Sequence, residues 1–143
     1  MIVDANILLC AHNADDPHHE AAREWLEAVL NGTTRVGLSW WSLTAFMRIV
    51  TNSRAYAYPL SAEAAATQVE EWLDAPRAWL AEPTAQYRDV LMTLVRTYEV
   101  RGALMTDAQL AALAIDHGVP VMSTDTDFAR FDAVEWINPL RPS

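Results

Sequence analysis

The sequence predicts an α/β fold in which helices cover both faces of a central, mostly parallel β-sheet. Short apolar runs alternate along the chain with longer segments of helical periodicity, which is typical of parallel strands joined by helices. A length of 143 residues and an apolar fraction of 52% fit one hydrophobic core. Because no repeat or linker divides the chain, we expect a single domain over residues 1–143.

The first expected strand, residues 1–4 (MIVD), is followed by a helix over residues 15–32. Asp16 suits the N-cap of this helix, Pro17 its first position and Gly32 the position just past its end. The apolar side chains at helical spacing that would face the core are Ala22, Trp25, Leu26, Val29 and Leu30.

A second strand is expected at residues 35–39 (RVGLS), and a third at residues 78–81 (AWLA). Between them, residues 41–52 and 61–75 have helical periodicity, and the second of these helices has an acidic outer face. The apolar face of the first consists of Leu43, Phe46, Met47 and Val50.

Two further helices are expected at residues 84–100 and 106–118, followed by strands at residues 119–123 (VPVMS) and 133–137 (AVEWI). Thr106 and Gln109 match a capping box at the start of the second helix, and Gly118 suits its end. In such sheets, ligands bind at the carboxyl ends of the strands, so we expect the functional residues at that edge.

The composition excludes several classes of function. There is no lysine, and four scattered glycines do not form a phosphate-binding loop. The net charge of −9 argues against a broad basic surface for nucleic acid, although it allows a small pocket that holds a metal ion. The single cysteine, the lack of a signal-like N-terminus and the lack of a long apolar run predict a cytoplasmic protein.

Carboxylates follow two of the expected strands and begin one helix. Asp4 ends the first strand, Asp107 lies in the first turn of a helix, and Asp125 and Asp127 follow VPVMS. Each could instead be a helix cap or a turn residue. Several carboxylates at one sheet edge would repel one another unless a cation lay between them, and oxygen ligands favour Mg²⁺, with Mn²⁺ as a second choice.

The segments IVDANILL, TDAQLAALA and VPVMSTDTDFARF resemble, in this order, motifs of the PIN domain and in particular of the VapC-type toxins of toxin–antitoxin modules. The resemblance covers nearly the whole chain. It implies a three-layer α/β/α sandwich and an acidic Mg²⁺ pocket. It also implies endoribonuclease activity on RNA, a cognate antitoxin that blocks the site, and a homodimer.

The resemblance also implies roles for individual residues. Asp4, Asp107 and Asp125 match the metal ligands, and Asp127 matches an auxiliary catalytic acid. If residues 123–127 stay extended, both late aspartates could face the pocket, whereas a helical turn starting at Thr124 would make Asp127 a cap.

Three further residues are expected to contact the substrate. Asn6 matches a polar residue that orients a carboxylate or contacts substrate. Arg48 and Arg130 could bind a phosphate, and Arg48 could equally pair with a pocket carboxylate.

One position departs from the family pattern. A glutamate is common three residues before the arginine of the central helix, but Ala45 stands there in LTAFMRIVTN. This leaves a single metal, or a water held by Ser42 or Thr44, in place of the missing carboxylate. Metal-assisted phosphodiester hydrolysis remains the expected chemistry.

Two other functions compete with the ribonuclease hypothesis. Ala45 supports a PIN-like module that is weak or inactive as an enzyme and mainly binds a partner. The motif VMSTDTDF also suggests a hydrolase that phosphorylates an aspartate, but such enzymes need a later lysine and this chain has none.

The tryptophan and histidine residues say less about function than the carboxylates do. Six tryptophans, among them Trp40 and Trp41 at the start of the central helix, suit either base stacking or a protein interface, and the interface is favoured. The four histidines lack the spacing of a zinc site.

Overall fold

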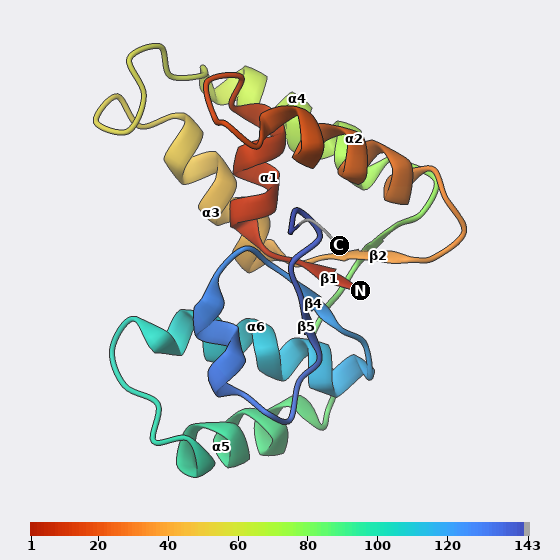
Figure 1. Cartoon of the computed structure of the whole chain (residues 1–143), viewed down its shortest axis with the longest axis vertical. Coiled ribbons are helices and arrows are strands. Elements are labelled where there is room, and N and C mark those ends of the chain that lie inside the picture. The colour runs from red at the N-terminus through yellow and green to blue at the C-terminus, as the bar shows by residue number, and fades with distance from the viewer. Residues whose placement is uncertain (142–143) are drawn as a thin grey trace.

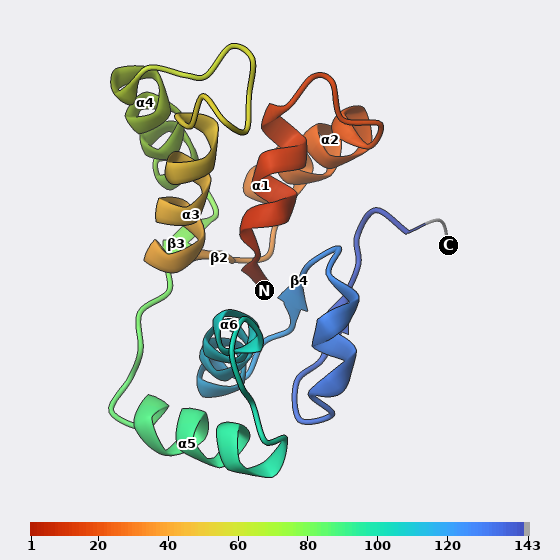
Figure 2. The same ribbon diagram turned by 90° about the vertical axis from the view of Figure 1, so that its left-hand side faces the viewer.

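A parallel five-stranded sheet in the order β3-β2-β1-β4-β5 runs through the middle of the molecule (Figures 1 and 2). The computed structural model describes residues 1–141. The strands are β1 (Ile2–Val3), β2 (Val36–Leu38), β3 (Ala78–Leu80), β4 (Val121–Met122) and β5 (Trp136–Ile137). Each lies within a segment predicted from its apolar run, and the central position belongs to β1.

Helices cover both faces of this sheet and complete a three-layer α/β/α sandwich (Figure 1). One face carries α1 (Ala5–His12), α2 (His19–Leu30), α3 (Trp40–Val50) and α4 (Ala62–Leu73), with a core built around Ile7, Leu26, Leu38 and Phe46. The other face carries α5 (Tyr87–Thr97), α6 (Leu104–His117) and the 3₁₀ helix η1 (Thr126–Arg130), with a core built around Ile2, Leu113, Phe128 and Phe131. None of the described helices is both long and apolar enough to cross a membrane.

The register of the strands determines which residues meet at the carboxyl edge of the sheet. Val3 pairs with Met122, and the Asp4 backbone N–H donates to the Met122 carbonyl at 3.0 Å. The next residues along the two strands, Asp4 and Ser123, therefore emerge side by side. Two segments that are far apart in sequence thus build one edge.

Close packing of β2 against β1 depends on Gly37. A Cβ atom at this position would lie 2.5 Å from Ile2 Cδ1 and 2.8 Å from the Met1 carbonyl oxygen. Glycine is needed here because of this close approach of the two strands.

Two helix starts differ from the sequence predictions. The Asp16 carboxylate accepts from the His18 N–H at 2.7 Å, so Asp16 and Pro17 lie in a turn before α2, and His18 is the N-cap. Helix α6 begins at Leu104, after Gly102 at φ 58°, so Thr106 lies inside the first turn and forms no capping box with Gln109. Gly118 ends α6 in the left-handed conformation, as predicted.

Helix α1 was absent from the predicted elements except as a helix that Asp4 could cap. Asp4 does cap it, because its Oδ1 accepts from the Ala5 N–H at 2.7 Å. Strand β1 therefore passes into α1 with a single residue between them. The predicted end of the 15–32 helix is confirmed to within two residues, at Leu30.

Candidate metal centre

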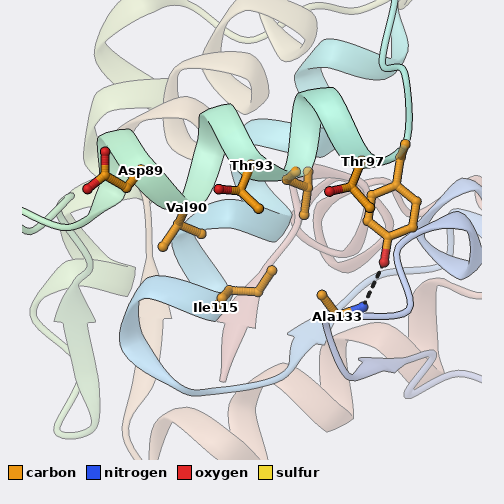
Figure 3. A pocket seen from close by; sticks show the side chains of 8 residues that line it. Asp89, Val90, Thr93, Thr97, Ile115 and Ala133 are labelled. Atoms are coloured by element: carbon orange, nitrogen blue, oxygen red, sulfur yellow. Dashed lines mark hydrogen bonds between the residues drawn. The ribbon is translucent and has the colours of Figure 1, made fainter.

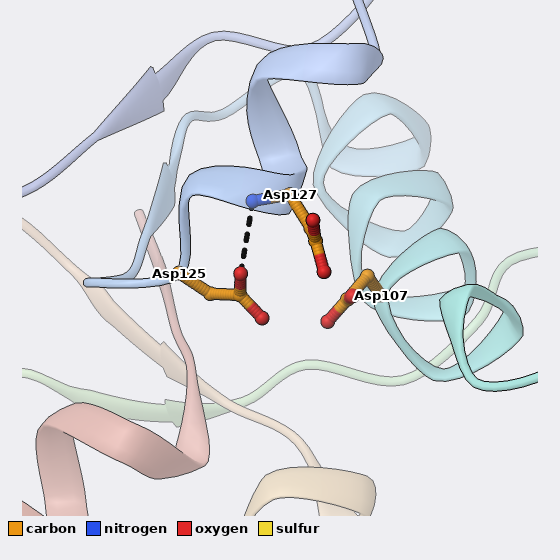
Figure 4. Close-up of side chains that lie close together, drawn as sticks. All are labelled: Asp107, Asp125 and Asp127. Carbon is orange, nitrogen blue, oxygen red and sulfur yellow. Dashed lines mark hydrogen bonds between the residues drawn. The ribbon is translucent and has the colours of Figure 1, made fainter.

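Three carboxylates converge at the carboxyl edge of the sheet. Asp107, Asp125 and Asp127 each offer one oxygen, and these oxygens all lie within 4.8 Å of one another (Figure 4). Asp107 comes from the first turn of α6, Asp125 from the cap of η1 and Asp127 from η1 itself. We call these three residues the acidic group. It is the one grouping of three or more Asp, Glu, His or Cys side chains at metal-binding distance among residues 1–141.

The turn after β4 brings both late aspartates into this group. The Asp125 carboxylate accepts from the Asp127 N–H at 2.9 Å and so caps η1, which begins at Thr126 (Figure 4). The extended alternative is therefore wrong, and so is the alternative of a turn capped by Asp127. Because the cap folds the chain back, Asp127 points toward Asp107, and the second Asp125 oxygen stays available.

Asp4 lies beside the acidic group and not within its 4.8 Å limit. Both of its oxygens have partners, since Oδ1 caps α1 and Oδ2 accepts from the Ser123 hydroxyl at 2.7 Å. Its negative charge nevertheless contributes to the raised pKa of Asp107. Of the expected metal ligands Asp4, Asp107 and Asp125, the last two belong to the acidic group, while Asp127 is its third member and Asp4 lies beside it.

Ser123 connects these acids, and sequence reasoning missed it. This fully buried serine donates to Asp4 and accepts from the Asp125 N–H at 3.0 Å and from Asn6 Nδ2 at 3.1 Å. Asn6 Oδ1 in turn accepts from the Thr124 N–H at 3.4 Å. The signal in the sequence was a serine that ends the apolar run VPVM two residues before Asp125. Asn6 therefore contacts Ser123 and the backbone of Thr124, and it reaches the carboxylates only through Ser123.

Burial and the charges of neighbouring carboxylates raise the pKa of Asp107 and of Asp4. Burial, together with the neighbouring charges of Asp125, Asp4 and Asp127, raises the pKa of Asp107 to about 7. Burial also raises the pKa of Asp4, although the hydrogen bonds from Ser123 and Ala5 oppose this. A cation bound between the carboxylates would relieve this repulsion, so the donor set fits a hard divalent ion.

Ala45 faces Asp4. A small cavity of about 50 Å³ is lined by Asp4, Ala5, Trp41, Ser42, Ala45, Thr106, Gln109 and Leu110. Ala45, where the family usually has an acid, therefore lies next to Asp4, which in turn lies beside the acidic group. Ser42 also lines this cavity, whereas Thr44 is exposed and donates to the Trp40 carbonyl at 2.6 Å.

The two arginines considered for phosphate binding lie at the rim or beyond it. Arg130 Nε is 3.9 Å from Asp127 Oδ1, and both side chains are at least half exposed. Solvent screens such a pair, so Arg130 is free to reorient. Arg48 is exposed in the last turn of α3 and forms no ion pair within residues 1–141.

Comparison with known proteins identifies relatives over nearly the whole chain. The PIN domain family matches residues 1–134. Ribonuclease VapC37 of Mycobacterium tuberculosis is 46% identical over 139 residues, which is 96% of each chain. Ribonuclease VapC33 of the same species is 38% identical over 141 residues, which is 99% of each chain.

Solved structures share the fold at lower identity. VapBC2 from Rickettsia felis, bound to a promoter DNA fragment, gives a TM-score of 0.72 at 18% identity and covers 96% of each chain. VapC20 of M. tuberculosis, a toxin that cleaves the sarcin–ricin loop, gives 0.65 at 21% identity, over 94% of this chain and 98% of that one. These likenesses confirm the predicted three-layer architecture.

Proposed function

The chain belongs to the PIN domain family, and from this membership we propose that it is a metal-dependent endoribonuclease, the toxin of a toxin–antitoxin pair. The observation that carries the proposal is the acidic group, with Asp4 beside it, at the carboxyl edge of a parallel sheet. Relatives at 46% and 38% identity bear the name ribonuclease over nearly their full length. We place its action in the cytoplasm, where it would meet RNA.

Mg²⁺, or Mn²⁺ in its place, is the cofactor that we propose for this group. Asp107, Asp125 and Asp4 would hold the ion, and when bound it would lower the pKa of a water molecule and offset charge on the phosphate. Asp127, at the open side, would orient the attacking water. Ser123 and Asn6 would keep Asp4 and Asp125 in place through the hydrogen bonds described above.

Phosphate binding is assigned to arginine side chains. A guanidinium group matches the geometry of a phosphate, and Arg130 lies next to Asp127. Arg48 and Asn6 are the further candidates for substrate contact. Without a bound cation, the acidic group would repel the RNA backbone, so substrate binding and metal binding would be coupled.

Cleavage of single-stranded RNA by the purified chain, with and without Mg²⁺, tests this proposal. Asp4→Asn, Asp107→Asn and Asp125→Asn should each abolish activity, and Asp127→Asn should cost less because its side chain is half exposed. The exposed Asp132, outside the acidic group, provides the matched control Asp132→Asn, which should retain activity. Full cleavage in the presence of a chelator would contradict the proposal.

A PIN-like module without catalytic activity is the second candidate, and Ala45 favours it. The family's usual acid is absent from the cavity where Ala45 faces Asp4. Ala45→Glu should strengthen Mg²⁺ or Mn²⁺ binding, because it adds a carboxylate next to Asp4. A metal titration of RNA cleavage in both proteins separates the candidates. A wild type that never cleaves, together with an Ala45→Glu variant that does, would favour the inactive module.

We propose that the partner is an antitoxin with a basic segment. Solved relatives of the same fold are VapBC complexes, and an acidic pocket in a chain of net charge −9 suits an arginine that displaces the metal. Apolar antitoxin residues would pack on exposed tryptophan. Co-expression with the small protein encoded next to this chain should yield a complex, and the toxin itself should form a homodimer in solution. Failure of the two proteins to form a complex would contradict the antitoxin prediction, and a monomeric toxin would contradict the homodimer prediction.

A further inference from the structure

A second hollow opens at the carboxyl ends of β2 and β3. It has a volume of about 450 Å³ and is lined by Ser39, Trp40, Trp41, Ala81, Glu82 and Pro83. We call it the tryptophan groove. Its size is in the range of sites for small organic groups, which is about 300–1,000 Å³. Its walls are the start of α3 and the connection from β3 to α5.

The tryptophan groove adjoins the small cavity at Asp4, because the two hollows share one lining residue. Trp41 lines both this groove and the small cavity that contains Asp4 and Ala45. The Ser39 hydroxyl in the groove donates to the Ser42 hydroxyl at 3.2 Å, and Ser42 lines the small cavity. A chain-like substrate with one phosphate at the acidic group would therefore extend a neighbouring unit into the groove.

One wall of the groove is held by Trp41. Its ring packs against Tyr87 with the centroids 5.6 Å apart, and the Tyr87 hydroxyl donates to the Gln109 carbonyl at 3.1 Å. Ser39 caps α3 by accepting from the Ser42 N–H at 3.1 Å. The aromatic wall is therefore formed before any ligand arrives, which lowers the cost of binding.

The opposite wall is fastened to the end of α6. Thr84 donates to the Asp116 carboxylate through its N–H at 2.8 Å and its hydroxyl at 2.6 Å. The His117 ring lies 2.7 Å from the Glu82 carbonyl oxygen. These contacts fix the backbone around Pro83 and leave the Glu82 side chain exposed at the groove.

The chemistry of the lining selects the kind of ligand. Trp40 is 46% exposed, so its ring offers an apolar face to the groove. Glu82 is the one charged residue in the lining, and a carboxylate repels a phosphate but accepts from N–H groups. An aromatic face with an acceptor beside it suits a nucleobase, because every base can stack and most present N–H donors on their edge.

We propose that the tryptophan groove binds one unpaired base of the RNA, stacked on Trp40 with its N–H edge toward Glu82. This inference rests on the proposed ribonuclease function and adds to it a binding site for one base of the RNA. Guanine fits best, since its Watson–Crick edge has two adjacent N–H donors for the two carboxylate oxygens. Uracil has one donor between two acceptors and fits least.

The experiment combines a protein variant with a modified RNA. Short single-stranded RNAs, each with one base replaced by an abasic unit, are titrated by fluorescence anisotropy against the wild type, Trp40→Ala, Trp40→Phe and Tyr58→Ala, with Ca²⁺ supplied. One abasic position should weaken binding to the wild type on the order of tenfold to a hundredfold. The same abasic unit should have little effect in Trp40→Ala. The base and Trp40 would be the two partners of one contact, so their effects on the binding free energy are not additive.

Two variants serve as controls. Trp40→Phe keeps an aromatic face and should restore most of the affinity. Tyr58 is 95% exposed in the connection that follows the far end of α3, so Tyr58→Ala removes an aromatic ring elsewhere and should bind like the wild type. With Mg²⁺, Trp40→Ala should raise KM for cleavage while kcat changes little, because Trp40 lies outside the acidic group.

We call an abasic position coupled if it weakens binding to the wild type but has little effect in Trp40→Ala. If the scan finds no coupled position, the proposal is overturned. A Trp40→Ala variant whose RNA binding equals that of the wild type would also overturn it, and a changed mass in analytical ultracentrifugation would then show that Trp40 contacts protein only. Cleavage without coupling would leave the proposed function standing and remove this subsite. Coupled binding without cleavage would support the base subsite and contradict the proposed ribonuclease function.

The identity of the base gives a second readout. Uracil at the coupled position should bind more weakly than guanine in the wild type, and Glu82→Ala should remove this preference while leaving the contribution of Trp40. Equal affinity for the two bases in the wild type would overturn the role of Glu82.

Discussion

Ser123 shows how much of the site depends on one uncharged residue. Its single hydroxyl contacts the Asp4 side chain, the Asn6 side chain and the backbone of Asp125. The acids themselves could be predicted, because carboxylates after strands at one sheet edge indicate a cation. Ser123 could not, because a serine at the end of an apolar run looks the same whether or not it links two acids.

Replacing Ser123 with alanine should destabilise the fold and the metal site together. Asp4 Oδ2 would lose its donor and the partly buried Asp125 N–H its acceptor, at a cost of about 1–3 kcal/mol. The pKa of Asp4 would rise further, so Mg²⁺ would bind more weakly. Urea unfolding and a Mg²⁺ titration measure the two effects.

The variant Ser39→Ala is the matched control for this prediction. Ser39 is a buried serine like Ser123, but its hydroxyl contacts only Ser42, it lies outside the cavity at Asp4, and none of its hydrogen bonds reaches an acid. It should reduce the free energy of unfolding and leave Mg²⁺ affinity close to that of the wild type. Equal losses of metal affinity in the two variants would show that Ser123 has no special link to the site.

Asp107 should make the stability of the metal-free protein depend on pH. Its pKa is raised from 3.8 to about 7 in the folded protein, so the folded state holds this proton where the unfolded state has released it. The resulting contribution is fully present at pH below 3.8 and is lost as pH rises toward about 7. Stability of the chelator-treated protein should therefore fall through this window.

Melting temperatures of the wild type and Asp107→Asn across this window isolate the effect. The difference between the two proteins should change with pH in the presence of a chelator and become smaller when Mg²⁺ is added. Parallel curves for the two proteins would mean that Asp107 titrates normally. The substitution also removes a charge that Asp125 and Asp127 repel.

At the scale of elements, the five strands could be predicted from their apolar runs, whereas the helix boundaries were predicted less accurately. Pro17 and Asp16 resemble a helix start, but the Asp16 side chain stabilises a turn instead. Helix α1 follows β1 so closely that its apolar residues continue the strand pattern. The 3₁₀ turn of η1 decides that Asp127 joins the acidic group, and no periodicity predicts so short an element.

Gly37→Ala should weaken the pairing of β1 and β2. The new methyl group would press on Ile2 and on the Met1 carbonyl, and overpacking of this kind costs about 1–3 kcal/mol. Urea unfolding measures the loss. Adding Ile2→Val removes the Cδ1 contact but not the backbone contact, so the double variant should recover part of the stability. An unchanged midpoint in Gly37→Ala would show that the strands can separate without cost.

At the scale of the whole molecule, the net charge of −9 limits how RNA is held. All ten basic residues are arginines, and Arg130 is the one that forms an ion pair with the acidic group among residues 1–141. Binding should therefore rely on a few phosphate contacts, the metal and stacking. This differs from nucleic-acid binders with broad basic faces, which release many counterions.

The salt dependence of KM tests this view. Few neutralised phosphates predict a loss of less than about tenfold between about 50 and 200 mM monovalent salt, at constant Mg²⁺. A loss of a thousandfold would indicate a basic surface that the described residues do not have. Arg130→Gln should make the dependence shallower still.

The apolar groove between α5 and α6, lined by Val90, Thr93, Leu94, Tyr98 and Ile115, lies on the layer away from α1–α4 (Figure 3). Tyr98 closes one end of it by accepting the Ala133 N–H at 3.2 Å. The two layers thus have separate surfaces, because the sheet lies between them. The sequence predicted the layers, but it could not predict which faces are hollow, since hollows depend on how side chains from several elements meet.

The pairing of β1 with β4 also sets a time at which the enzyme can first act. A ribosome adds Asp4 119 residues before Ser123, and Asp125 and Asp127 follow Ser123. Until β4 inserts next to β1, a growing polypeptide has no complete catalytic edge. We therefore expect a nascent chain that ends before β4 to lack ribonuclease activity, so the activity would begin only after most of the domain has been translated.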